Sequence, residues 1–125
     1  MNKDNQFSQD IKDIGCVKEH STFLKELVEK NFFDSEMSAS KFAVAIAIKD
    51  KHCSPSKTSK NRITKFASNS FDSDKMLSNI IKLIYKKSDM VNFPFRIIEN
   101  LLAQGLDILQ KEFEDNEEFS LDDYL

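Results

Sequence analysis

The most regular pattern of apolar and polar positions lies between Pro94 and Glu114. Apolar residues recur there every three or four positions, which places them on one face of an α-helix; they are Ile97, Ile98, Leu101, Leu102, Leu106, Leu109 and Phe113. Pro94 suits the first turn of a helix, because its ring fixes a helical φ. Gly105 interrupts the pattern at a cost of about 1 kcal/mol relative to alanine. We predict a helix over 94–114 in which Gly105 permits close packing against another helix.

The longest uncharged apolar run is the seven residues from Phe42 to Ile48, with a lysine on each side. As a strand, the run would place valine and isoleucine on one face and alanines on the other. As a helix, it follows Ser38, a residue type that caps helix N-termini. Alanine and lysine are common in helices and depleted in strands. We therefore favour a buried helix from about Ser38 to Lys51, with the strand as the alternative.

Two further helices are predicted from shorter patterns, over about 20–30 and about 74–87. Asp72 or Ser73 is the expected cap of the second, since short polar side chains accept hydrogen bonds from free N–H groups at a helix start. The apolar stripe of that helix consists of Met76, Leu77, Ile80, Ile81 and Ile84.

The remaining segments have weaker patterns. Residues 11–18 alternate weakly and indicate one short strand ending near Lys18. Residues 52–61 contain Ser54-Pro55-Ser56 and are expected to form a loop. Residues 63–71 are expected to be irregular or extended.

Composition supports a mainly α fold. The 125 residues include only two glycines and two prolines, too few for a turn-rich β-sandwich or barrel. The length corresponds to one domain. We predict a compact bundle of about four helices with one short N-terminal strand. This single domain spans 1–113, of which 1–10 are expected to be frayed, and an acidic flexible tail follows over 114–125.

The net charge of −3 combines a basic segment with an acidic one. Residues 51–65 contain five basic residues and no acid, namely Lys51, Lys57, Lys60, Arg62 and Lys65. Positive charges among serine, threonine and asparagine side chains are what contact with nucleic acid phosphates requires. A solvated loop without a ligand is the alternative.

Residues 101–125 contain eight acids and one base, a net charge of −7. Acidic runs often act only as solubilising segments. In the acidic segment of this chain, however, large apolar residues lie among the acids, as in short peptides that dock on a partner's basic groove. The residues predicted to bind a partner are Phe119, Leu121, Asp122, Asp123, Tyr124 and Leu125.

Cys16 and Cys53 do not form a disulfide framework, and the chain begins with a polar segment and contains no apolar run of about 18 residues. The expectation is a reduced, cytoplasmic protein without a membrane segment. These two cysteines and the two histidines, His20 and His52, are the only residues of these types in the sequence, and adjacent ligands on a loop point apart. We therefore expect no metal and no cofactor.

Catalytic chemistry is not expected either. His52 and Cys53 are neighbours in sequence only, whereas a cysteine nucleophile needs a base held at hydrogen-bond distance. Asp72 and Asp74 faintly resemble the acidic residues of metal-dependent nucleases but are better explained as helix caps. The sequence contains no glycine-rich phosphate loop.

One resemblance to a known family rests on three stretches of the chain. They are 18–28 (KEHSTFLKELV) with Phe32-Phe33, 42–49 (FAVAIAIK) and 98–109 (IENLLAQGLDIL). This pattern resembles the small bacterial proteins encoded beside the Dnd DNA phosphorothioation genes. The resemblance covers about 18–113. It implies a non-catalytic accessory component of an anti-phage or DNA-modification-linked defence locus.

The expected function is therefore an accessory or adaptor subunit of a bacterial defence complex, which binds other protein subunits and, through its basic segment, DNA; a homodimer is also compatible. The alternative is a ribbon-helix-helix transcriptional regulator. A short strand over about 14–18 and helices over 21–30 and 38–49 match the order of elements in such regulators. The strand side chains, however, are poorly suited to reading bases.

Overall fold

The computed structural model describes residues 9–58 and 61–115. Within them, five helices accompany an antiparallel sheet of two strands. In chain order the elements are β1 (Asp13–Cys16), α1 (Lys18–Glu29), α2 (Glu36–Lys49), β2 (Ile63–Ala67), α3 (Ser68–Phe71), α4 (Met76–Ile84) and α5 (Pro94–Asp115). The mainly helical fold is confirmed, as is the helix over 42–48. None of the helices in the described part is long and apolar enough to cross a lipid bilayer.

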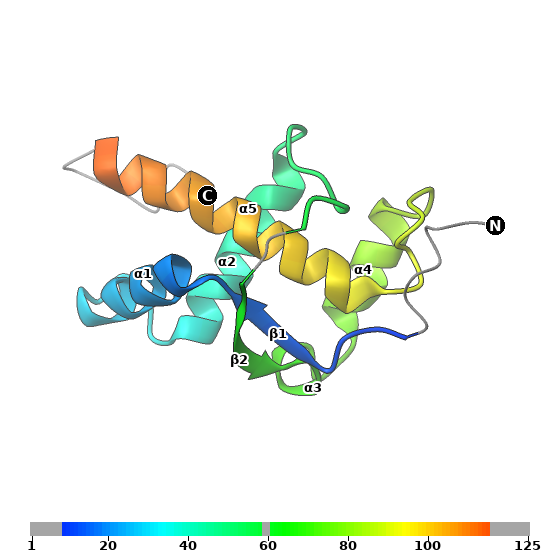
Figure 1. Ribbon diagram of the computed structural model, residues 1–125, viewed down its shortest axis with the longest axis horizontal. Helices are drawn as coiled ribbons and strands as arrows, with labels where there is room; N and C mark the ends of the chain where they lie inside the picture. Colours follow the sequence, from blue (N-terminus) through cyan, green and yellow to red (C-terminus); the bar gives the residue numbers. More distant parts are fainter. Residues whose placement is uncertain (1–8, 59–60, 116–125) are drawn as a thin grey trace.

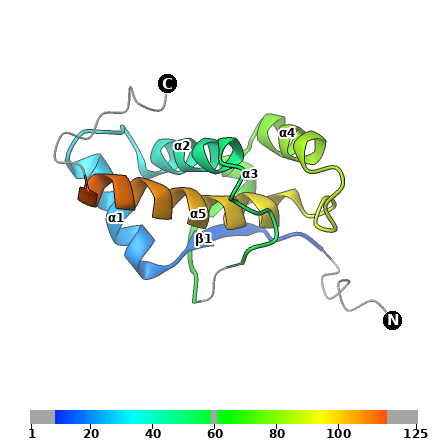
Figure 2. The ribbon, with the colours of Figure 1, turned by 90° about the horizontal axis from the view of Figure 1, so that it is seen from above.

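The longest helix, α5, lies in the middle of the molecule (Figure 1). Helices α2 and α4 lie along one side of it, and β1 lies along the other (Figure 2). The fully buried apolar side chains of α5 contact both sides and form the centre of the core; they are Ile97, Ile98, Leu101, Leu102, Leu106 and Leu109. The helical spacing of the sequence predicted that these side chains share a buried face of α5.

The closest helix contact joins α2 and α5. Ala39, Ala43 and Ala47 recur every fourth residue along α2 and are completely buried. A Cβ atom at Gly105 would overlap the backbone carbonyl of Ala43. The small side chains of α2 and the glycine of α5 together allow the two backbones to touch, which confirms the packing role predicted for Gly105.

The two strands pair over only a few residues and contain a bulge. Ile14 pairs with Phe66 and Gly15 pairs with Thr64, so that Lys65 has no partner in β1. An extra residue in one strand bends that strand and redirects its side chains. As a result Lys65 and Phe66 are both partly buried although they are consecutive. Residues 63–71 were expected to be irregular or extended, and their pattern does not indicate the helical turn of α3.

The N-terminal boundary of the ordered core is earlier than predicted. Asp10 was assigned to a frayed segment, but its carboxylate accepts hydrogen bonds from the backbone N–H groups of Phe95 and Arg96 at 2.8 and 3.1 Å. It therefore caps α5, where the first N–H groups of a helix have no partner within the helix. At α2 the cap is Ser35, whose hydroxyl accepts from the N–H of Ser38 at 3.0 Å, and not Ser38 itself.

The predicted cap of α4 is confirmed, but its buried face differs from the prediction. The Asp72 carboxylate accepts from the N–H groups of Leu77 and Ser78 at 2.9 and 2.8 Å. Ser78 and Ile81 are the buried residues of this helix. Three members of the predicted apolar stripe are instead exposed to solvent, namely Met76, Ile80 and Ile84. The helix is also shorter than the predicted 74–87.

Candidate functional site

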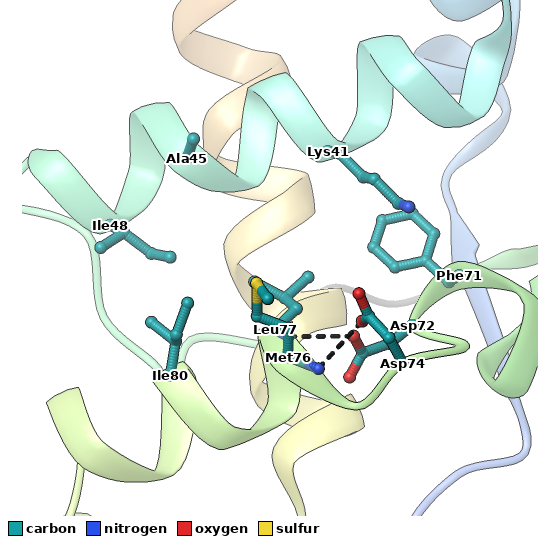
Figure 3. A pocket seen from close by; sticks show the side chains of 9 residues that line it. All are labelled: Lys41, Ala45, Ile48, Phe71, Asp72, Asp74, Met76, Leu77 and Ile80. Atoms are coloured by element: carbon teal, nitrogen blue, oxygen red, sulfur yellow. Dashed lines mark hydrogen bonds between the residues drawn. The ribbon is translucent and has the colours of Figure 1, made fainter.

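A groove of about 380 Å³ lies between α2 and α4. It is lined by Lys41, Ala45, Ile48, Phe71, Asp72, Asp74, Met76, Leu77 and Ile80. Figure 3 shows Ile48 of α2 and Ile80 of α4 on facing sides of the groove. At one end the ammonium group of Lys41 lies 5.7 Å from the centre of the Phe71 ring, a favourable cation–π distance. The groove is mainly apolar between these points.

The apolar surface continues from the groove along α4. Among the described residues five large hydrophobic side chains are exposed, and four of them belong to α4. Their exposed fractions are 62% for Met76, 42% for Ile80, 71% for Leu83 and 48% for Ile84. Single exposed hydrophobic residues are common, whereas a contiguous group of them usually marks a binding surface. We call this surface, with the groove beside it, the α4 groove.

The segments that form and flank the α4 groove are rich in exposed lysines, while the groove itself is lined by one lysine, Lys41, and two aspartates, Asp72 and Asp74. Exposed lysines within 36–49 and 72–89 are Lys41, Lys49, Lys75, Lys82, Lys86 and Lys87. The exposed acids in the same two ranges are Asp74 and Asp89. Asp72 is 3% exposed and accepts two backbone hydrogen bonds, while Glu36 forms an ion pair with Lys65 away from the groove. The result is an apolar surface on segments with an excess of exposed lysines.

The groove was not among the predicted sites, although the sequence contains a signal for it. Six of the nine residues of α4 are large and apolar. A helix of fewer than three turns with that composition has apolar residues on more than one face, and a single neighbouring helix covers only one. Which face remains uncovered depends on the packing against α5, and this could not be read from the local pattern.

Lys65, one of the predicted nucleic-acid-binding residues, lies inside the protein. Its Nζ atom is 2.6 Å from Oε1 of Glu36 and donates to the Ser21 hydroxyl at 2.9 Å. Its side chain is only 14% exposed. The lysine thus links β2 to α1 and α2, a structural role that the acid-free stretch 51–65 did not suggest.

Arg62 also has partners within the protein. Its Nε donates to Oε2 of Glu99 at 2.6 Å, and its Nη2 donates to the Asp13 carbonyl at 2.6 Å. The same Glu99 oxygen accepts from the Gly15 N–H at 2.8 Å. Through these bonds α5 holds β1 and the beginning of β2 in place.

The remaining predicted site residues are exposed or lie outside the described residues. Lys51 and Lys57 are exposed, whereas Lys60 belongs to the part of the chain that the structure does not describe. Phosphate contact by the basic segment stays a prediction that depends mainly on these three lysines. The predicted partner-binding residues Phe119, Leu121, Asp122, Asp123, Tyr124 and Leu125 are likewise outside the described residues.

Of the histidines and cysteines, His20 and Cys16 are buried, His52 is exposed and Cys53 is partly buried. Among the described residues, no group of three or more histidine, cysteine, aspartate or glutamate side chains is placed to hold a metal ion. His20 is buried, and its Nε2 atom is 2.7 Å from Oδ1 of Asp107, which joins α1 to α5. Burial raises the pKa of the Cys16 thiol to about 11, with Lys65 opposing the rise and Glu36 adding to it. A thiol of this kind is a poor nucleophile, since the thiolate is the reactive form.

We expect the Cys16 thiol to react very slowly in the folded protein. At pH 8 its thiolate fraction should be about a hundredfold smaller than that of a thiol with the ordinary pKa. In a Cys53→Ala variant, a thiol reagent should therefore modify Cys16 only after denaturant is added. Modification of the native variant at the rate of a free cysteine would contradict the buried placement. The raised pKa also means that Cys16 favours the folded state below about pH 9, and that this contribution is lost as the pH rises to about 11.

The order of β1, α1 and α2 is the order expected for a ribbon-helix-helix regulator. In regulators that read DNA with strands, the strand side chains must project into a groove of the DNA. Here Ile14, Gly15 and Cys16 are buried, and β1 pairs with β2 of the same chain. This arrangement gives no support to base recognition by β1.

Comparisons of the chain with protein-family models, with curated proteins and with solved structures found no match.

Proposed function

We propose that this chain is a non-catalytic adaptor that binds a partner protein through the α4 groove. The observation that carries the proposal is the group of four exposed large hydrophobic side chains on one short helix. Complete burial of such a side chain contributes about 1.5–3 kcal/mol, so covering this surface is a substantial driving force for association. Protein interfaces commonly combine an apolar centre with a polar border, and Lys41, Asp72 and Asp74 supply polar groups beside the apolar lining.

Helix α4, which carries this surface, is anchored to the protein core and capped at its first turn. Ile81 is completely buried in the core, and Asp72 caps the first turn with two hydrogen bonds. The exposed side chains are thus presented by a fixed backbone, and a partner does not have to order the helix when it binds. This reduces the entropic cost of association.

The proposed setting is a cytoplasmic protein complex linked to bacterial defence or DNA modification. Its support is the resemblance of residues 18–113 to the Dnd-associated accessory proteins. DNA contact through Lys51, Lys57 and Lys60 is an additional part of this proposal. It is independent of the α4 groove, which lies on α2 and α4.

The proposal predicts that a charge placed in the groove separates the adaptor from its complex. In gentle extracts of the cells that naturally produce it, the wild-type chain should elute with a larger mass than its monomer. An Ile80→Glu variant should elute as a monomer, because burying a carboxylate among apolar groups is unfavourable.

Ile63→Glu is the matched control. Ile63 is 44% exposed and Ile80 is 42% exposed, but Ile63 lies on β2 and does not line the groove. The control variant should elute as the wild type does. If Ile80→Glu also kept the wild-type elution volume, or if the wild type itself were monomeric, the α4 groove would not be the binding surface.

A further inference from the structure

We infer that the occupant of the α4 groove is the acidic segment 116–125 of a second copy of this chain. The inference rests on the proposed function, because it names the partner of the same groove. It unites two features of one sequence, an apolar surface on lysine-rich segments and an acidic segment with apolar residues.

Charge complementarity is the first argument. Six exposed lysines and two exposed acids lie on the elements that form and flank the groove. Residues 116–125 (NEEFSLDDYL) contain four acids and no base. Opposite potentials favour the encounter of these two surfaces and help to fix their orientation.

The apolar residues provide the second argument. The exposed residues of α4 run from Met76 to Ile84, a distance of about 12 Å along a helix axis. Phe119 to Leu125 would cover about 9 Å as a helix and more if extended. Leu121, Tyr124 and Leu125 also have the i, i+3, i+4 spacing by which a peptide helix presents its apolar residues to a groove. The two surfaces thus match in length and in character.

The length of the chain favours a second copy over the same copy. Helix α5 has 22 residues and is about 33 Å long. Helix α4 lies beside the N-terminal half of α5 (Figure 1). Asp115 is the last residue of the C-terminal half of α5. Phe119 follows Asp115 by four residues and reaches about 14 Å at most, less than half the length of α5. Phe119 therefore cannot reach the groove of its own copy, whereas the groove of a second copy is open to it.

The decisive experiment mixes two variants that are each defective in one half of the contact. The groove variant carries Ile80→Glu. The segment variant carries Phe119→Ser, Leu121→Ser and Tyr124→Ser and leaves residues 9–115 unchanged. We expect the purified wild type to self-associate with rising concentration in sedimentation equilibrium, and each variant alone to remain monomeric. An equimolar mixture of the two should form heterodimers, because one copy contributes an intact groove and the other an intact segment.

A peptide with the sequence of residues 114–125 tests the contact directly. It should bind the segment variant, whose groove is free. Its affinity for the groove variant should be lower by a factor of about ten or more. Affinity should fall as salt rises from about 50 mM to about 500 mM, because exposed charges are screened. Ile63→Glu added to the segment variant should bind the peptide as strongly as the segment variant itself does.

Two results would overturn the inference. One is a wild type that stays monomeric at all accessible concentrations and a peptide that does not bind. The other is a segment variant that still self-associates while the groove variant does not, which would assign the groove to a different part of the second copy. Either result would leave the elution test of Ile80→Glu in cell extracts unaffected, so failure of this inference is distinguishable from failure of the adaptor proposal.

Discussion

Replacing Gly105 with alanine is expected to lower the free energy of unfolding by about 3 kcal/mol. The added methyl group would overlap the carbonyl of Ala43, a backbone group that cannot rotate away as a side chain can. The higher helix propensity of alanine returns only about 1 kcal/mol. Chemical denaturation should show the loss, and the melting temperature should fall by roughly 10 °C.

Two controls make this result specific. Glu112→Ala on the exposed face of α5 should change stability by no more than about 0.5 kcal/mol. Adding Ala43→Gly to Gly105→Ala should not restore stability, because the overlap involves backbone atoms that every residue has. Recovery in the double variant would show that side chains, and not the backbones of α2 and α5, limit the approach.

Replacing Glu99 with alanine is expected to cost about 2 kcal/mol. The change leaves the Gly15 N–H and the Arg62 Nε–H without the carboxylate that accepts from both. The Glu99 side chain is 14% exposed, so water only partly replaces it. Denaturation of Glu99→Ala measures the loss. The exposed Lys30–Glu26 pair provides the comparison, and Glu26→Ala should cost about 0.5 kcal/mol or less. Equal effects of the two changes would contradict a structural role for Glu99.

Local periodicity predicted the long helices well. The spacing of apolar residues predicted α5 almost to its ends, and the alanine-rich run predicted α2, because both signals act within a few turns of helix. The role of Gly105 was also predictable, since glycine inside a helix usually has a packing reason. Asp10 was missed, because it caps a helix that begins 84 residues later.

The sheet and the ion pairs were also hard to predict, because they join residues that are far apart in the sequence. The bulge at Lys65 breaks the alternation that identifies a strand, and the pairing of β2 with β1 joins distant segments. Arg62 and Lys65 belong to a stretch without acids, but their carboxylate partners, Glu99 and Glu36, come from α5 and α2. A charge count along the sequence does not detect neighbours of this kind.

The candidate site was not predictable from any single segment. It depends on which face of α4 turns toward α5 and on the position of α2 beside it. The composition of α4 indicated excess apolar surface, but not its location.

The central claim, that the exposed face of α4 is a protein-binding surface, is tested most directly by photo-crosslinking from that face in living cells. A photoreactive amino acid at position 83, where the leucine is 71% exposed, should yield a defined adduct with another polypeptide chain. The same amino acid at the exposed position 111 of α5 serves as the control and should not yield it. The account predicts that Ile80→Glu abolishes the adduct from position 83. No adduct from that position, or one that persists in the Ile80→Glu background, would contradict it.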